Sequence, residues 1–192
     1  MGEKEKRFML RDLQPEQKQW AEYNFDGVRA HHAPLGMIEE VGELARALLK
    51  TEQGIRGAED QHRARMIDAV GDITIFLADY CNVHGLELPE PRSGTIPVSS
   101  LHIHVFLVHV RLSHLLKNEM YRTSDYLLLA DVGGVMDALG EFCRAANIDI
   151  HQAVMDTWRE VKQRDWRKYP QNGRCDPTLH TEVTRGFGLG EK

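Results

Sequence analysis

The sequence feature that most constrains the fold is a pair of acidic segments separated by a glycine-containing turn. The first segment, GMIEEVGELARALLK, begins at Gly36, and the second, RARMIDAVGD, ends at Asp72. Read as a helix, the first segment places Glu39, Glu40 and Glu43 on one stripe, because residues three or four apart share a helical face. Both segments are predicted to be helices that carry acidic side chains on one side.

The second segment repeats this pattern with Asp68 and Asp72, which lie four residues apart on one helical face. Ile75 and Phe76 place apolar bulk on or beside the same face. The commonest role of an acidic stripe is a solvated surface. A face exposed only to water would not normally carry an isoleucine and a phenylalanine, so the pattern favours a partly buried site.

An antiparallel hairpin would bring the two acidic faces together. In such a hairpin, residues equidistant from the turn at 54–57 lie opposite each other. Glu40 is then expected to face Asp72, and Glu43 to face Asp68. Short connections of this kind are typical of helical hairpins. Four or five carboxylates are then predicted to converge, and their like charges repel unless a cation neutralises them. Ligand sets made only of oxygen suit hard cations, so we expect Mg²⁺, for which Mn²⁺ can substitute.

The remainder of the chain also reads as helical, because no convincing alternating strand pattern occurs. The predicted class is therefore all-α. Asp149 precedes the last helix as an expected N-cap. The predicted helices cover residues 14–25, 34 to the turn at 54, 59–83, 99–117, 124–146 and 150 to about 168.

A degenerate internal repeat divides these helices into two hairpins. ALLKTE and DAVGD in the first hairpin match HLLKNE and DALGE in the second, so that Lys50 corresponds to Lys117 at an offset of 67. The same offset places the three glutamates opposite Phe106, Leu107 and Val110, which are expected to be core residues. The two hairpins are predicted to form a four-helix-bundle core with one metal site, flanked by an N-terminal and a C-terminal helix.

Composition and charge narrow the class of protein. With 42% hydrophobic and 28% charged residues, an ordinary globular domain is expected over residues 1–170, followed by an extended or flexible tail over 171–192. A net charge of −5 argues against nucleic-acid binding. The sequence contains no apolar run long enough to predict a membrane-spanning helix. The charged N-terminus does not resemble a secretory signal. Three widely spaced cysteines predict a reducing, cytoplasmic location.

These motifs resemble the MazG-like, all-α nucleoside triphosphate pyrophosphatases, a superfamily that includes the dimeric dUTPases, the dCTP pyrophosphatases and phosphoribosyl-ATP pyrophosphatase. The resemblance extends from about Trp20 to Pro170 and is most specific in EEVGELARALLK and DAVGDITIFL. HHAPLG and DIHQAV add support. The resemblance implies Mg²⁺-dependent cleavage of a (d)NTP between the α and β phosphates, giving a (d)NMP and pyrophosphate. A water activated by the metal or by a carboxylate would attack phosphorus.

The resemblance also implies roles for individual residues. Glu40, Glu43 and Asp72 would bind the metal, and Glu39 would bind it or activate the water. All four would be catalytic. The remaining implied substrate contacts are Trp20, Phe25 and His32 near the base and Lys162 and Arg164 facing the phosphates.

Two features depart from the family pattern. The family's ExxD motif would place a glutamate at position 69, where this chain has Ala69, and Asp68 is expected to substitute as a metal ligand. The family's closing helix carries a lysine and an asparagine that align with Thr157 and Val161. A weaker phosphate clamp, with low activity or an altered substrate, would follow.

Two other functions remain open from the sequence. Glu59 and His62 form one ExxH unit of the type that di-iron bundle proteins use, although those proteins need two copies. The departures from the family pattern also leave open a non-catalytic helical interaction module with a relic metal site. The favoured prediction is a nucleoside triphosphate pyrophosphohydrolase that forms a homodimer or homotetramer.

Overall fold

The computed structural model describes residues 8–27, 29–92, 100–121 and 124–174, and all regular secondary structure in these ranges is helical. The predicted all-α class is confirmed. Most of the predicted tail, from residue 175 onward, lies outside the described residues. A 3-10 turn at Leu10–Asp12 precedes the helices α1 (Leu13–Asn24), α2 (His32–Gln53), α3 (Glu59–His84), α4 (Leu101–Met120), α5 (Asp125–Ala145) and α6 (Ile150–Val161).

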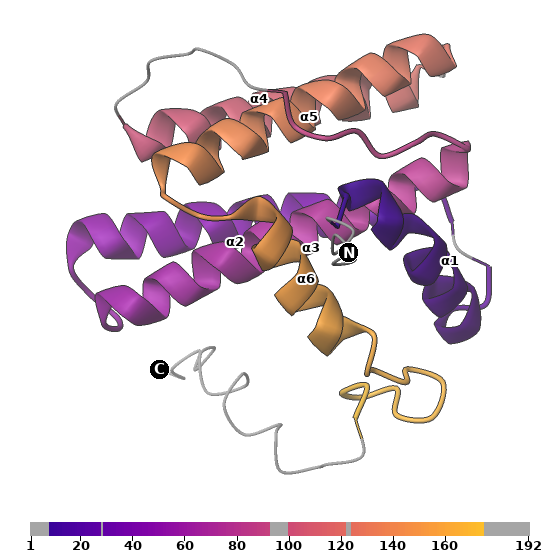
Figure 1. Ribbon diagram of the computed structural model, residues 1–192, viewed down its shortest axis with the longest axis horizontal. Helices are drawn as coiled ribbons and strands as arrows, with labels where there is room; N and C mark the ends of the chain where they lie inside the picture. Colours follow the sequence, from indigo (N-terminus) through magenta and orange to yellow (C-terminus); the bar gives the residue numbers. More distant parts are fainter. Residues whose placement is uncertain (1–7, 28, 93–99, 122–123, 175–192) are drawn as a thin grey trace, which may run out of the picture.

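The core consists of two helical hairpins, α2/α3 and α4/α5, which lie one above the other in Figure 1. Helix α2 also packs against α4, and α3 contacts α5, so the four helices form a closed bundle. The predicted four-helix-bundle core made from two hairpins is confirmed. None of the described helices is long and apolar enough to span a lipid bilayer.

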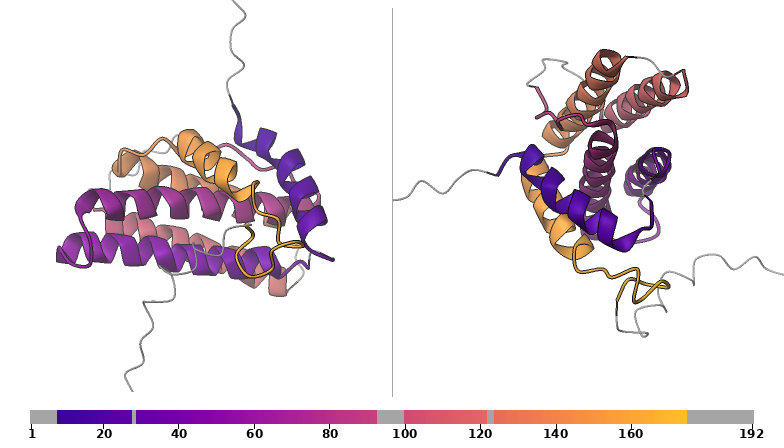
Figure 2. Two further views of the ribbon diagram at one scale, coloured as in Figure 1. Left: turned by 90° about the horizontal axis from the view of Figure 1, so that it is seen from below. Right: turned by 90° about the vertical axis from the view of Figure 1, so that its right-hand side faces the viewer.

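The two flanking helices cover one side of this bundle. Both α1 and α6 pack on α3, and the right-hand view of Figure 2 shows them on the side away from α2 and α4. The outer side of α2 and α4 is left uncovered by the described elements. The cavity described below lies on the covered side.

Local sequence signals explain where several helices begin and end. The carboxylate of Asp149 accepts hydrogen bonds from the backbone N–H groups of His151 (3.0 Å) and Gln152 (3.1 Å), which confirms the predicted N-cap of α6. Helix α2 ends at Gln53 and is capped by Gly54, whose φ of +63° is accessible to glycine at little cost. The chain can therefore reverse direction within a short turn.

The last helix is shorter than predicted. It was expected to continue to about residue 168, but α6 ends at Val161. The backbone N–H of Trp166 donates a hydrogen bond to Asn24 Oδ1 on α1 (2.7 Å), so the chain leaves the helical path to reach this partner. This turn directs the side chains of Arg164 and Trp166 into a cavity beside α3.

The prediction that Phe106, Leu107 and Val110 belong to the core is wrong. Phe106 is 61% exposed and Val110 is 48% exposed, while Leu107 is only partly buried. The repeat preserves helix faces: Glu39 and Glu43, the counterparts of Phe106 and Val110, are also exposed. The buried positions of α4 are instead His104, Val105, Val108, Leu112 and Leu115.

Candidate active site

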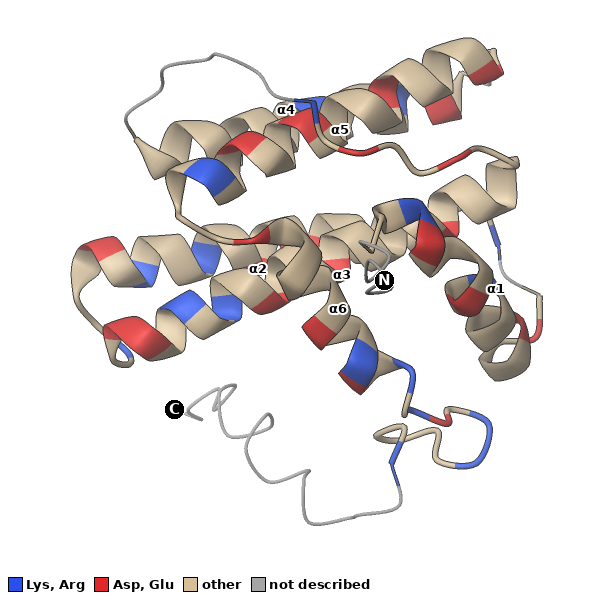
Figure 3. Ribbon diagram, viewed as in Figure 1, with Lys and Arg blue, Asp and Glu red and all other residues tan. Residues whose placement is uncertain are grey.

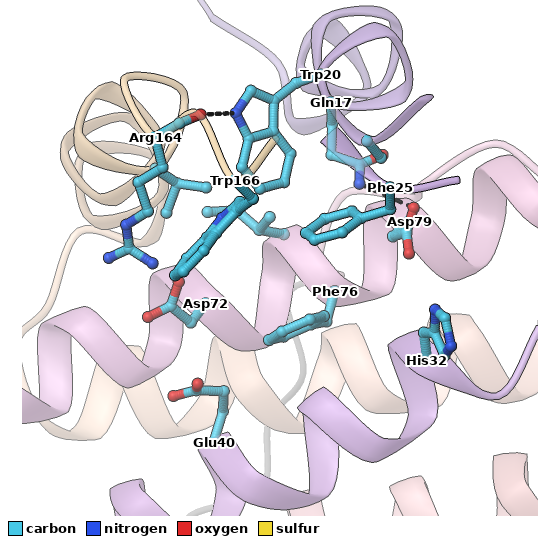
Figure 4. A pocket seen from close by; sticks show the side chains of 13 residues that line it. Gln17, Trp20, Phe25, His32, Glu40, Asp72, Phe76, Asp79, Arg164 and Trp166 are labelled. Atoms are coloured by element: carbon cyan, nitrogen blue, oxygen red, sulfur yellow. Dashed lines mark hydrogen bonds between the residues drawn. The ribbon is translucent and has the colours of Figure 1, made fainter. Parts of the chain in front are cut away.

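A cavity of about 500 Å³ lies between α1, α2, α3 and the segment that follows α6 (Figure 4). Aromatic side chains form much of its wall, and acidic side chains lie at both of its ends. The lining residues are Gln17, Trp20, Ala21, Phe25, His32, Glu40, Asp72, Ile75, Phe76, Asp79, Val161, Arg164 and Trp166.

Glu40 from α2 and Asp72 from α3 form one acidic end of this cavity (Figure 4). Burial raises the pKa of Glu40 to about 8, and repulsion from Asp72 and Glu43 adds to the effect. Burial also raises the pKa of Asp72 to about 7, with repulsion from Asp68 as the next cause. The pairing of residues across the turn therefore brings these carboxylates close enough to repel one another, as the sequence predicted.

The other predicted acidic residues lie around this end of the cavity rather than in its wall. Glu39, Glu43 and Asp68 are exposed. Partial desolvation, followed by repulsion from Glu160 of α6, raises the pKa of Asp68, so this side chain lies toward α6. Ala69, where the resemblance implies a glutamate, is buried in the core. The acidic residues of α3 at this end of the cavity are Asp68 and Asp72.

The donor set suits a hard divalent cation in type, because it consists of carboxylates whose raised pKa values indicate uncompensated negative charge. Within the described part of the chain, no group of three or more His, Cys, Asp or Glu side chains is placed to hold an ion. Glutamate has several rotatable bonds. Holding an ion between α2 and α3 would therefore require Glu40 and Glu43 to turn toward Asp72.

The two predicted phosphate-binding residues lie in different places. The carbonyl of Arg164 accepts a hydrogen bond from Trp20 Nε1 (3.0 Å), and the guanidinium lowers the pKa of Asp72, opposing its burial. Lys162 does not line the cavity: its Nζ lies 3.3 Å from Glu16 Oε2. Figure 3 shows other basic residues gathered on the segment after α6. Arg164 is therefore the cation next to the acidic end.

The predicted base-binding residues all line the cavity. Trp20 meets Phe25 edge to face, with ring centroids 5.6 Å apart, and His32 lies farther along the same cavity (Figure 4). Sequence reasoning did not assign a role to Phe76 or Trp166, whose rings also face the cavity. Flat aromatic walls suit a planar ligand that can stack on them.

Two polar residues at the opposite end were also missed. Asp79 is only 8% exposed, and Gln17 Nε2 donates a hydrogen bond to Asp79 Oδ1 (2.9 Å). Burial raises the pKa of Asp79, while this hydrogen bond and the nearby His32 oppose the rise. The available signal was a single acidic residue inside the apolar run 73–81, seven residues after Asp72.

The histidine of the ExxH unit has a different environment. His62 is buried near the start of α3, where its Nε2 lies 3.1 Å from the carbonyl oxygen of Ile55. This contact joins α3 to the turn that precedes it. His62 is therefore separate from the cavity and its carboxylates.

The sequence matches no family model, and no curated protein or solved structure is significantly similar to it. The functional interpretation therefore depends on the cavity, on the chemistry of its lining residues, and on the motifs in the sequence.

Proposed function

We propose that this protein is a Mg²⁺-dependent nucleoside triphosphate pyrophosphohydrolase that converts a (d)NTP into a (d)NMP and pyrophosphate. The observation that carries the proposal is that one cavity joins two carboxylates with raised pKa values, Glu40 and Asp72, to a slot of aromatic rings. A nucleotide has the same division, with a charged phosphate chain at one end and a flat base at the other.

The carboxylates would hold Mg²⁺, or Mn²⁺ in its place, through Glu40, Glu43 and Asp72 with Asp68 beside them. When bound, the cation would neutralise phosphate charge and stabilise the oxygens that accumulate charge during phosphoryl transfer. Glu39, at the exposed edge of the site, would accept a proton from the attacking water.

The remaining residues would position the nucleotide. Arg164 would donate hydrogen bonds to phosphate oxygens that the metal leaves free, because a guanidinium matches phosphate geometry. Trp20, Phe25 and His32 would lie along the base and exclude water from it. Thr157 and Val161, at the family's lysine and asparagine positions, are buried in the packing of α6. Arg164 would therefore provide the charge that those positions provide in the family.

A nucleotide panel tests this proposal directly. The purified protein is incubated with each (d)NTP and Mg²⁺ or Mn²⁺, and the products are identified. We expect pyrophosphate and a monophosphate, and release of orthophosphate would reject the reaction. Glu43→Gln should lose turnover but keep its helical circular dichroism, whereas Glu52→Gln, on the same helix but away from the cavity, should keep both. Wild-type rates from Glu43→Gln would remove the metal site.

The same experiment separates the alternative functions. Iron and visible absorbance on purification would favour the di-iron reading. Absence of turnover with every nucleotide and with either metal would favour the non-catalytic helical module.

We also propose that the protein is a homodimer, formed through the uncovered side of the bundle. The exposed apolar positions on α2 alternate at spacings of three and four residues, as in helices that pack against another helix. Small residues lie at the centre of this stripe on α2 and large ones on α4, so two copies related by a twofold axis would fit together. This apolar face consists of Leu35, Ile38, Gly42, Ala45 and Leu49 on α2 and Ile103, Phe106 and Val110 on α4.

Light scattering coupled to size-exclusion chromatography tests the dimer. Val110→Glu places a charge in the proposed interface and should shift the mass from dimer toward monomer. Glu22→Gln, an exposed position on α1 on the covered side of the bundle, is a suitable control. A wild-type protein that is monomeric at all accessible concentrations would reject the dimer, and a mass of four chains would favour the tetramer.

A further inference from the structure

The cavity has a second acidic end, where Asp79 is buried away from Glu40 and Asp72 (Figure 4). Asp79 follows Asp72 by seven residues on α3, which corresponds to about 10 Å along a helix at 1.5 Å per residue. This separation is comparable to the span from the α phosphate of a nucleotide to the far edge of its base. A nucleotide lying along α3 with its phosphates at Asp72 would therefore bring its base edge to Asp79.

A chain of amide side chains fixes the orientation of this carboxylate. Gln17 Nε2 donates to Asp79 Oδ1 (2.9 Å), and Gln17 Oε1 accepts a hydrogen bond from Asn82 Nδ2 (2.6 Å). Asn82 Oδ1 in turn accepts a hydrogen bond from Gln14 Nε2 (3.3 Å). Each amide is thereby committed to one orientation, with its N–H₂ group toward Asp79. The hydrogen bond from Gln17 therefore restrains Oδ1 of the carboxylate.

One oxygen of this carboxylate remains for a ligand. Among the residues that the structure describes, hydrogen bonds to Asp79 come from Gln17 and end on Oδ1, so that none reaches Oδ2. A buried carboxylate needs several hydrogen-bond donors to offset its loss of water. His32 lines the same cavity and lowers the pKa of Asp79 electrostatically. Asp79 lines this cavity and a neighbouring pocket, and its Oδ2 is available to accept a hydrogen bond from a molecule in the cavity.

We propose that Asp79 selects the base of the nucleotide by accepting a hydrogen bond from an exocyclic amino group. Cytosine and adenine nucleotides are then preferred over uracil and thymine nucleotides. The inference rests on the proposed function, because it takes the cavity to be a nucleotide site.

The chemistry of the bases explains this preference. Uracil and thymine carry a carbonyl oxygen where cytosine carries its amino group, and a carboxylate oxygen repels that carbonyl. Gln17 has a second amide hydrogen, which can donate to the ring nitrogen next to the amino group of cytosine or adenine. Asp79 and Gln17 together therefore match the donor and acceptor pair on the edge of an amino-bearing base.

Equilibrium binding without metal tests this inference. CMP, AMP, UMP and TMP are titrated into the full chain in EDTA, and binding is followed by quenching of Trp20 and Trp166 fluorescence. We expect CMP and AMP to bind at least about tenfold more tightly than UMP and TMP, which is the selectivity of one well-placed hydrogen bond. Equal affinities in the wild-type protein, or a preference for UMP, would overturn the inference.

Variants separate selection from a structural role. Asp79→Asn should reduce the ratio of CMP to UMP affinity to about threefold or less, because an amide also offers a donor to a carbonyl. Asn82→Ala removes the amide that orients Gln17, so it should lower the ratio by less than Asp79→Asn does. Gln19→Ala, at an exposed position of α1 that does not line the cavity, should keep the ratio. An unchanged ratio in Asp79→Asn would overturn the inference. If Asp79→Asn does not fold, Asp79→Ser provides the same comparison.

The two proposals fail in distinguishable ways. Selective binding of CMP and AMP without hydrolysis of any triphosphate would reject the pyrophosphohydrolase and leave base selection in place. Hydrolysis of every (d)NTP to pyrophosphate with equal kcat/KM would confirm the reaction and reject selection by Asp79.

Discussion

The two hairpins of the bundle share a topology, but their acidic residues lie in different electrostatic environments. In α3, the pKa values of Asp68 and Asp72 are both raised. Burial is the largest cause, and repulsion from neighbouring carboxylates is the next. In α5, the matching residues Asp137 and Glu141 each pair with an arginine. Arg92 Nε donates to Asp137 at 2.9 Å, and Arg144 lies 2.5 Å from Glu141. In the first hairpin, burial and repulsion outweigh the opposing charge of Arg164. In the second, each acidic residue has an arginine partner, Arg92 from the connection before α4 and Arg144 from α5.

The elements that cover the hairpins also differ. Gly71 of α3 and Gly140 of α5 occupy matching positions in DAVGD and DALGE, and each permits a close approach. A Cβ at Gly71 would lie 2.5 Å from Thr157 Cβ of α6, and one at Gly140 would lie 2.6 Å from Pro91 Cβ. Helix α6 leads directly to Arg164, which enters the cavity. The comparison indicates that the covering element, as much as the hairpin itself, determines where a site can form.

The largest difference between the hairpins is expected for Asp72→Asn and Asp137→Asn. Asp72→Asn should lower kcat/KM by about 100-fold or more, because the proposed site would lose one of its metal ligands. It should also raise the stability of the metal-free protein, since the variant removes a carboxylate whose pKa is raised by burial.

Asp137→Asn removes a charge that pairs with an exposed arginine, so kcat/KM should stay within about twofold of the wild-type value. Steady-state kinetics and thermal unfolding in EDTA measure both effects. Equal losses of activity in the two variants would show that the site is not confined to the first hairpin.

A second matched pair, Gly71→Ala and Gly140→Ala, tests the covering elements. Each added methyl group meets a close neighbour, so each variant should lose about 1–3 kcal/mol of unfolding free energy, partly offset by the better helix propensity of alanine. Only Gly71→Ala should raise KM for the nucleotide, because it displaces α6 and the segment that carries Arg164. Urea denaturation and kinetics provide the two measurements. A similar rise in KM for Gly140→Ala would contradict this division of roles.

Much of the fold was predictable because its signals are local. Apolar periodicity gave the helices, and the glycine turn at 54–57 gave the first hairpin. The end of α6 was not predictable, because it depends on the hydrogen bond from Trp166 to Asn24, 142 residues away in sequence. The exposure of Phe106 was missed for a similar reason: the side of α4 that faces the core is decided by how the hairpins pack.

The candidate site was also predictable only where its residues belong to neighbouring segments of the chain. The approach of Glu40 and Asp72 followed from counting outward from the turn. The position of Lys162 was not predictable, because α6 ends just before this residue. Its side chain contacts Glu16 and does not line the cavity. Asp79 was missed because a lone acidic residue in an apolar run has no partner in its own segment, and Gln17 comes from a different helix.

Stability as a function of pH should also distinguish the hairpins. Burial raises the pKa of Glu40 to about 8 and that of Asp72 to about 7, so the folded protein retains protons that the unfolded chain releases at lower pH. The stabilisation is complete below the ordinary carboxylate pKa values and is lost as the pH rises through about 7 to 8. After allowance for solvent screening, we expect a loss of about 2 kcal/mol in EDTA.

Thermal unfolding across this pH range measures the loss, and Mg²⁺ should reverse it with release of protons. The double variant Glu40→Gln/Asp72→Asn should show a flatter profile, because the carboxylates of the second hairpin are already paired with arginines. An unchanged profile in the double variant would assign the pH dependence to other groups.

The smallest effect is expected from Arg92→Ala, which frees Asp137 from its surface ion pair. The change in Tm should be under about 2 °C, because exposed ion pairs contribute little. The informative measurement is the Tm of Arg92→Ala/Asp72→Asn with and without Mg²⁺. We expect no stabilisation by Mg²⁺, because α4 offers Phe106 and Val110 where α2 offers glutamates, so too few oxygen ligands remain. Stabilisation of this variant would instead mean that arginine pairing, rather than the lost glutamates, keeps the second hairpin free of metal.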